Sequence, residues 1–99
     1  MSNTRRGHDT ERRCAQELKE LGYDVIRSAA SKSVWDIIAI GADDIRLIQC
    51  KRTKKHVRSA AAPKSVLAEM REAPAPNGCV SKQLWTWVDR KGWVVTTVV

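Results

Sequence analysis

The stretch VWDIIAIGADDIRLIQCKR, Val34 to Arg52, decides the fold. Two runs rich in β-branched residues flank the tetrapeptide GADD, whose Gly and Asp residues favour a tight turn. This pattern predicts two antiparallel strands joined as a β-hairpin. If the turn pairs Ile40 with Ile45, the register of every other pair in the hairpin follows.

Outward from this hairpin, the sequence predicts an α/β (α+β) domain. A helix over about residues 8–21 ends at Gly22, and a strand over YDVIRS leads to the hairpin. Pro63 suits the first turn of a second helix, and the tail predicts two strands joined at DRKG. The expected order is α-β-β-β-α-β-β in a single domain, residues 1–99, with residues 1–7 as a basic mobile arm.

Composition narrows the possible partners. The 99 residues carry 18 Lys and Arg against 11 Asp and Glu, a net charge of +7, and the sequence pI is about 9.8. Such a field favours phosphate-bearing partners or acidic membranes. No apolar run approaches the roughly 20 residues of a membrane-spanning helix, and the N-terminus has no apolar signal core. We therefore expect a soluble cytoplasmic protein with no membrane partner, associated with the nucleoid and of a size that would suit a phage.

Polar side chains interrupt the second hairpin strand near its end. Side chains alternate along a strand, so Gln49 and Lys51 share one face and Cys50 points to the other. The predicted register places Asp36 opposite Gln49, and opposed side chains lie about 4.5–5.5 Å apart at Cβ. An acid, an amide oxygen and an ammonium group therefore converge on one patch.

The first helix adds a second acid to this patch. Cys14, Leu18 and Leu21 form an apolar stripe at helical spacing, and Glu11 continues that stripe towards the N-terminus. We therefore expect Glu11 to approach the patch from the helix.

These residues suit the hydrolysis of a phosphodiester bond. A hard cation such as Mg²⁺ takes oxygen ligands and usually keeps several waters beside one or two carboxylates and a substrate phosphate. Asp36, the amide oxygen of Gln49 and the backbone carbonyl of Cys50 could each supply an oxygen, and Glu11 could add a negative charge through a water. Lys51 could orient the attacking water or stabilise negative charge on the phosphate.

Simpler interpretations remain open for each residue. Gln49 and Lys51 could form a solvated strand edge, where lysine discourages aggregation. Glu11 could be an acid of the first helical turn, favoured by the helix dipole. Cys50 is expected to pack in the core rather than to act as a nucleophile, because it faces away from the polar patch. The cysteines show no C-x-x-C spacing and predict reduced thiols rather than a zinc site.

One ordered set of motifs spans the first half of the chain, GHDTERRCAQELKELGYDVIRSAASKSVWDIIAIGADDIRLIQCKR. It resembles the PD-(D/E)-x-K nuclease superfamily, and most closely the archaeal-type Holliday-junction resolvases. In that group a glycine and a Glu-Arg pair open the first helix, and a strand, a serine-containing loop, an Asp and an acidic-x-Lys motif follow. The matching features here are Gly7, Glu11 and Arg12, then GYDVIRSAAS, then Asp36, then Gln49 and Lys51.

The resemblance implies a restriction-endonuclease-like fold, with a mixed central β-sheet of about five strands flanked by two helices. It implies a DNA endonuclease that depends on Mg²⁺ or Mn²⁺ and works as a homodimer, nicking both strands of a four-way junction symmetrically. It further implies metal binding by Glu11, Asp36 and Gln49, a catalytic role for Lys51, and a contribution from Ser31.

Two residues depart from the family pattern. Gln49 stands where the family usually has Asp or Glu, and Trp35 stands where a proline often precedes the Asp. The amide removes one negative charge, so the metal should be held more weakly or depend more on Glu11. Two alternatives therefore accompany the resolvase: a restriction or repair nuclease acting on linear or damaged DNA, and a non-catalytic DNA-binding module of the same fold.

Basic residues border the predicted site on the arm and first helix, around the serine loop and after the second hairpin strand. As a set they favour a rim that binds the phosphates of branched or duplex DNA, although any single one could simply be solvated. The predicted DNA-binding residues are Arg5, Arg6, Arg12, Arg13, Arg27, Lys32, Arg52, Lys54, Lys55 and Arg58.

The C-terminal strands carry tryptophans. Trp85 and Trp87 share one face of a strand, and Leu84 and Val88 share the other, so both faces are apolar. The helices of so small a domain can bury one of these faces, and we expect burial of the second in a homodimer interface, with core packing and stacking on exposed bases as alternatives.

Overall fold

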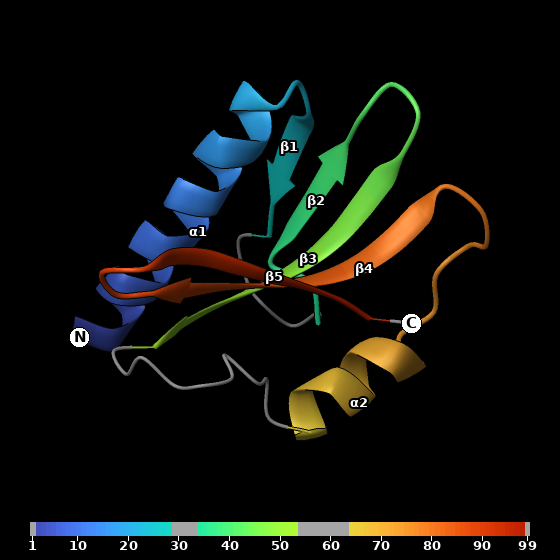
Figure 1. The fold of residues 1–99 in the computed structure, drawn as a ribbon. Helices are drawn as coiled ribbons and strands as arrows, with labels where there is room; N and C mark the ends of the chain where they lie inside the picture. Colours follow the sequence, from blue (N-terminus) through green and yellow to red (C-terminus); the bar gives the residue numbers. More distant parts are fainter. Residues whose placement is uncertain (1, 29–33, 54–63, 99) are drawn as a thin grey trace.

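The computed structural model describes residues 2–28, 34–53 and 64–98, with residues 2–8 described by their backbone (Figure 1). The elements follow the predicted order of helices and strands. They are α1 (Ser2–Glu20), β1 (Asp24–Arg27), β2 (Ile37–Ile40), β3 (Ile45–Thr53), α2 (Lys64–Glu72), β4 (Val80–Val88) and β5 (Gly92–Val98).

The strands form one mixed sheet in the order β1-β2-β3-β4-β5. Neighbours are antiparallel except β3 and β4, which are parallel because the chain crosses over through α2. The β2–β3 hairpin has the predicted register, with Ile40 opposite Ile45 and Ile37 opposite Ile48. The predicted fold class and hairpin are therefore confirmed.

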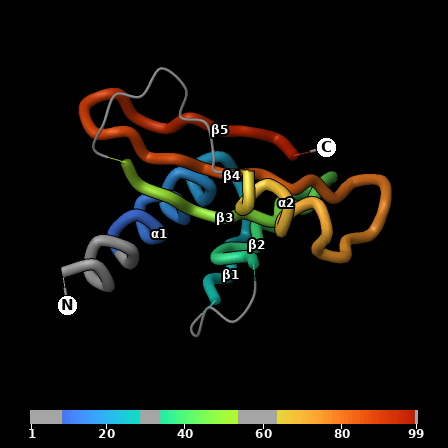
Figure 2. Tube along the Cα trace, turned by 90° about the horizontal axis from the view of Figure 1, so that it is seen from below, coloured from blue at the N-terminus to red at the C-terminus, as the bar shows by residue number. Residues whose placement is uncertain are grey.

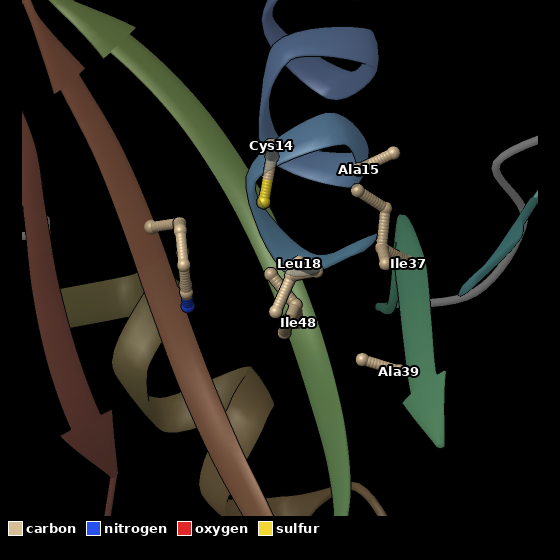
Figure 3. Close-up of a cluster of buried hydrophobic side chains, with 7 residues drawn as sticks. Cys14, Ala15, Leu18, Ile37, Ala39 and Ile48 are labelled. Carbon is tan, nitrogen blue, oxygen red and sulfur yellow. The ribbon is translucent and has the colours of Figure 1, made fainter. Parts of the chain in front are cut away.

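One helix packs on each face of the sheet. Figure 3 shows Cys14 and Leu18 of α1 facing Ile48 of β3, within a cluster that also contains Trp85. A second cluster holds Met70 of α2 and the β4 residue Leu84, and α2 contacts β5. Successive residues of a strand point to opposite faces, so the burial of Leu84 with α2 and of Trp85 with α1 places the helices on opposite faces.

Helix α1 ends in a capping motif. At the end of α1, Gly22 has a φ of 96° and its N–H bonds the carbonyl of Lys19, while the N–H of Tyr23 bonds the carbonyl of Leu18. This pair of bonds is a Schellman motif, for which glycine is favoured. Leu21 lies in that turn after the last helical residue and is 57% exposed, so its predicted place on the buried stripe is wrong.

Helix α1 starts earlier than the sequence predicts. It begins at Ser2, so residues 2–7 are helical rather than an arm separate from the helix. This stretch has no proline, and one glycine, Gly7, costs a helix interior only about 1 kcal/mol relative to alanine. In a helix of 19 residues that cost does not end the element.

The face of β4 that carries Trp85 and Trp87 packs against other parts of the same chain. Trp85 is 4% exposed and lies in the α1 cluster, and the guanidinium of Arg13 lies 4.4 Å from the centre of the Trp87 ring. Trp93 contacts both rings edge-on, with centroid distances of 5.4 and 5.1 Å. Core packing, one of the predicted alternatives, therefore explains the burial of Trp85, and the homodimer interface stays a prediction.

Figure 2 views the same chain from below and shows α1 and α2 at different parts of the sheet. Helix α1 contacts β1, β2 and β3, so one helix spans the strands that carry the predicted site. Among the described residues, no helix combines the length and apolar character needed to cross a membrane.

Candidate active site

The site lies where β2 and β3 separate, at the end of the hairpin away from its turn. The ladder stops at Ile37 opposite Ile48, one pair before the predicted pair of Asp36 and Gln49. Instead, the N–H of Asp36 donates to the carbonyl of Ile48 at 2.9 Å, and the N–H of Cys50 donates to the Asp36 carboxylate at 3.0 Å. The carboxylate of Asp36 is therefore held against the backbone of β3 beside Gln49 rather than in a regular cross-strand pair.

Gln49 carries an unusual oxygen. Its Oε1 is buried and accepts no hydrogen bond within the described part of the chain. A buried polar atom without a partner costs about 1–3 kcal/mol, and native structures contain few of them. A buried amide oxygen without a partner among the described residues is available as a ligand for a cation.

Glu11 reaches the site from α1. Its Oε1 lies 3.6 Å from Nη2 of Arg27, and Arg27 is the residue of β1 that pairs with Ile37, next to Asp36. The pair is only partly exposed, with side-chain exposures of 36% for Arg27 and 19% for Glu11. Arg27 therefore pairs with a carboxylate of the helix near the start of β2, which Asp36 immediately precedes.

Cys50 lies between these groups and the core. The thiol of Cys14, through a hydrogen bond, raises the pKa of the Cys50 thiol well above its ordinary range, and burial and the negative charges of Asp36 and Glu11 raise that pKa further. Cys50 packs against the α1 cluster, which confirms the packing role predicted for it. The Asp36 carboxylate accepts the N–H of Cys50 at 3.0 Å, and α1, which carries Glu11, contacts β3.

Lys51 is the last of the predicted site residues that the structure describes. It is exposed, pairs with Thr86 across the parallel β3–β4 ladder, and by strand alternation lies on the face of Gln49. An ammonium group therefore stands two residues beyond the unpaired amide oxygen and at the rim of the site.

The donor set fits a hard divalent cation. Among residues 9–28, 34–53 and 64–98, no group of three or more His, Cys, Asp or Glu side chains could hold a metal ion. The oxygens present are the carboxylates of Asp36 and Glu11 and the unpaired Oε1 of Gln49. Mg²⁺ prefers oxygen ligands and needs only one or two carboxylates when a substrate phosphate completes its shell. The orphaned amide oxygen is the feature that such an ion would satisfy.

The predicted basic rim is only partly described. Ser31, Lys32, Lys54, Lys55 and Arg58 lie outside the described residues, as do the side chains of Arg5 and Arg6. Arg12 pairs with Asp9 at 3.2 Å on the exposed face of α1. Arg52 forms two bonds to the carboxylate of Asp89, at 3.1 and 3.2 Å. These arginines are therefore held in place, whereas their role in DNA binding stays a prediction.

One pocket is lined both by arginines of the predicted basic rim and by a tryptophan. It has a volume of about 220 Å³ and is lined by Asp9, Thr10, Arg13, Arg52 and Trp87. Sequence reasoning missed the stacking of Arg13 on Trp87, because contacts between a helix and a distant strand leave no short-range pattern. An aromatic ring beside two arginines is suited to contact nucleic acid.

The fold and the candidate site agree with the nuclease class that the sequence motifs predict, with carboxylate and amide oxygens and a lysine near the open end of the central hairpin. Residues 2–65 match the family model of the archaeal Holliday junction resolvase (Hjc). The chain therefore belongs to the Hjc family, as the motifs in its first half predict.

A solved structure agrees with this assignment at the level of the fold. Archaeoglobus fulgidus Hjc, described as a Holliday junction resolvase from an archaeal hyperthermophile, is similar with a TM-score of 0.72 and 22% sequence identity. The similarity covers 94% of this chain and 73% of that chain. The curated proteins contain no match to this chain.

Proposed function

We propose that this chain is a divalent-metal-dependent endonuclease that resolves four-way DNA junctions by symmetric nicks, working as a homodimer. One observation carries the proposal: a buried amide oxygen of Gln49 lacks a partner among the described residues, beside the Asp36 carboxylate. The chain belongs to the Hjc family, and the resemblance of its motifs implies a metal-binding role for position 49. A structural residue would instead be expected to satisfy its own hydrogen bonds.

In this proposal one group of residues binds the metal ion, and Lys51 stabilises negative charge on the phosphate. Asp36, Gln49, Glu11 and the backbone carbonyl of Cys50 would hold Mg²⁺ or Mn²⁺. A bound divalent ion polarises the phosphate and makes a water easier to deprotonate. Lys51, at the rim, donates hydrogen bonds to the phosphate oxygens, where negative charge grows as water attacks phosphorus.

Arg27 has a positioning role in this scheme. Its guanidinium holds the Glu11 carboxylate at 3.6 Å, so the helix presents that acid towards β3 rather than to solvent. Ser31 stays a predicted contributor from the loop before Asp36, outside the described residues.

DNA binding would depend on charge and shape. If about six phosphates are neutralised by the basic rim, log affinity falls with log salt at a slope near −5, at roughly −0.9 per phosphate. No element suggests a base-reading helix among those described, so recognition would follow the branched shape of the DNA rather than its sequence.

The proposal is tested by giving the protein a four-way junction and a linear duplex of the same sequence, each with Mg²⁺ or with EDTA. Symmetric nicks in the junction, dependent on Mg²⁺, are the expected result. Equal cutting of both substrates would identify a general nuclease instead. Tight junction binding without cutting would identify a DNA-binding module, the alternative that the missing acid at position 49 favours.

The homodimer is tested separately. Light scattering coupled to gel filtration gives the mass of the free protein and of its complex with the junction. Two chains in each are expected, because symmetric nicking of two strands requires two copies of the site. A single chain bound to a junction that is nevertheless cut symmetrically would remove the dimer from the proposal.

A further inference from the structure

The pocket beside Trp87 lies outside the candidate metal site. It has a volume of about 220 Å³ and opens between α1 and the ends of β3 and β4. The face of β4 that carries Trp87 packs on α1, whereas strand alternation turns Gln49 and Lys51 to the opposite face of the sheet. The pocket therefore needs an explanation of its own.

Trp87 gives this pocket an aromatic wall. Its ring meets the ring of Trp93, its partner across the β4–β5 ladder, edge-on with centroids 5.1 Å apart, and the Arg13 guanidinium lies 4.4 Å from its centre. Trp87 is nevertheless only half-buried, whereas Trp85 is fully buried. Bases stack both on aromatic rings and on arginine guanidinium planes. A base in the pocket would therefore contact a supported ring and a cation that is already stacked on it.

Basic residues of the β4–β5 turn stand next to this ring. Arg52 of β3 forms two bonds to the carboxylate of Asp89, the first residue of the turn, at 3.1 and 3.2 Å. Arg90 and Lys91 follow in the turn and are exposed. Figure 1 shows the turn beside α1, the helix from which Arg13 reaches Trp87. Cations from α1, β3 and the turn thus gather around one aromatic ring.

Arg90 has a backbone conformation that arginine rarely adopts. Its φ is 70°, and it is the one residue other than glycine with a positive φ among those that the structure describes. Asn, Asp or Gly suit this left-handed conformation better, and residues held in it cluster at functional sites. A basic side chain therefore occupies a position for which the backbone alone would favour another residue.

We propose that this pocket binds an unstacked base of the DNA, with the base against Trp87 and Arg13 and its neighbouring phosphates on the basic residues of β3 and the β4–β5 turn. Extruding a base costs least where its pairing and stacking are already interrupted, as at a branch point. The inference rests on the DNA binding of the proposed function and not on its metal ion.

The pocket lies close enough to the metal site for one DNA strand to reach both. Arg52 follows Gln49 by three residues along β3, which is about 10 Å at roughly 3.3 Å per residue. One strand of DNA advances about 3.4 Å per nucleotide along the helix axis. The bound base should therefore lie within a few nucleotides of the phosphate at the metal site.

The first experiment uses the wild-type protein. A four-way junction carries 5-iododeoxyuridine at its branch point, and the complex is irradiated in EDTA so that the base cross-links to an aromatic side chain stacked on it. Mass spectrometry of the digested complex is expected to find the cross-link on Trp87. The same base in the middle of a junction arm should give none there. Absence of a Trp87 cross-link from every branch-point position would overturn the inference.

The second experiment replaces the aromatic wall. Fluorescence anisotropy in EDTA should show that Trp87→Leu weakens junction binding by about five- to 150-fold, the loss expected for one stacked base. Trp87→Phe should retain most of the affinity, because it keeps an aromatic face. Urea denaturation first establishes that each variant is folded. Equal affinities of folded Trp87→Leu and wild type would contradict the proposal.

The third experiment removes one cation from the turn. Arg90→Asn inserts a residue that suits a positive φ, so the fold should not be weakened. Log affinity should then fall less steeply with log salt, by about 0.9 in slope, the value for one phosphate contact. Arg71→Gln, at an exposed position of α2 on the other face of the sheet, is the matched control and should leave the slope unchanged. An unchanged slope in Arg90→Asn would contradict the proposed contact between the turn and a phosphate.

The two proposals can fail independently. A protein that cuts junctions but gives no cross-link to Trp87 keeps the proposed function and loses this inference. A protein that gives the cross-link and loses affinity in Trp87→Leu, but cuts no junction, keeps the inference and loses the proposed cutting.

Discussion

The two ends of the β2–β3 hairpin differ in whether their polar side chains have hydrogen-bond or ion-pair partners. At the turn, the hydroxyl of Tyr23 lies 2.8 Å from both carboxylate oxygens of Asp44. Arg46 lies 3.4 Å from the same carboxylate and 4.7 Å from the centre of the Tyr23 ring. At the other end, the buried oxygen of Gln49 has no partner among the described residues. The same two strands thus carry a saturated polar cluster at one end and an unsaturated one at the other.

This difference is the one expected if the polar groups at the turn hold the fold and those at the open end bind a ligand. The cluster at the turn fastens the hairpin to the start of β1, because every charged group in it faces a partner of opposite charge or a hydroxyl. The open end keeps a buried oxygen that no described residue satisfies, which costs stability. A site that must accept a cation has to leave its oxygens available, so we expect substitutions at the two ends to change different properties.

The largest expected effect is on catalysis at the open end. Lys51→Ala should lower the rate of junction cutting by about 10²–10³, the range observed when one group that stabilises transition-state charge is lost. Asp36→Asn, which removes a carboxylate proposed to hold the metal, should abolish cutting. Single-turnover cleavage assays measure the rates, and gel-shift titrations should show junction binding largely unchanged. Retained cutting in both variants would show that the site assignment is wrong.

At the turn, replacing Gly41 by a larger residue should lower the stability of the fold and leave the rate of cutting unchanged. A Cβ added at Gly41 would lie 2.8 Å from both the Tyr23 ring and a carboxylate oxygen of Asp44, and 3.2 Å from the Asp44 carbonyl. Gly41→Ala should therefore lower the free energy of unfolding by about 1–3 kcal/mol, as overpacking does. Urea denaturation measures the change, and Ala42→Ser, at an exposed neighbour in the same turn, should stay within about 0.5 kcal/mol of wild type.

The Gly41→Ala variant would also test whether the two ends of the hairpin are independent. The rate of cutting by folded Gly41→Ala should match that of wild type, because the turn lies at the far end of the hairpin from Asp36. A large loss of rate without a loss of stability would mean that the two ends are coupled.

Much of this comparison could be predicted from the sequence. The turn residues GADD fixed the pairing of Ile40 with Ile45, and strand alternation then separated Gln49 and Lys51 from Cys50. These features follow from local rules with a period of two residues. The motif order in the first half likewise predicted the family to which the chain belongs.

The remaining features depend on contacts between distant segments. The end of the ladder at Ile37, the ion pair of Glu11 with Arg27 and the stacking of Arg13 on Trp87 each join elements far apart in the chain. No short-range pattern encodes where α1 crosses the sheet, so the sequence could place Glu11 on the buried side of the helix but not identify its partner.

A smaller effect should appear when the unpaired oxygen is removed. Gln49→Met keeps the length of the side chain without its buried polar atoms, so it should raise the free energy of unfolding by about 1 kcal/mol while impairing cutting. Gln83→Met is the matched control, because the Oε1 of Gln83 accepts the Trp85 indole N–H at 3.0 Å. That variant should lose about 0.5–1.5 kcal/mol. Urea denaturation in EDTA distinguishes the two, and destabilisation by both would show that Gln49 is satisfied in the folded protein.

The smallest effect concerns a thiol at the open end. Cys50 immediately precedes Lys51, yet its side chain packs on the other face against Cys14, whose hydrogen bond, together with burial and nearby carboxylates, raises the pKa of Cys50. Cys79 is exposed, whereas Cys14 is fully buried. A disulfide reagent such as dithionitrobenzoate should therefore label Cys79 rapidly in the folded protein and the other two thiols only after unfolding, with no change in cutting.

Raising the pH sharpens this last prediction. Labelling of Cys50 should stay slow, because its folded-state pKa is raised and the reactive species is the thiolate. Cys79→Ser should abolish the rapid phase. A remaining rapid phase, accompanied by loss of cutting, would mean that the Cys50 side chain faces the polar patch, and the separation between the catalytic and core faces of β3 would then be wrong.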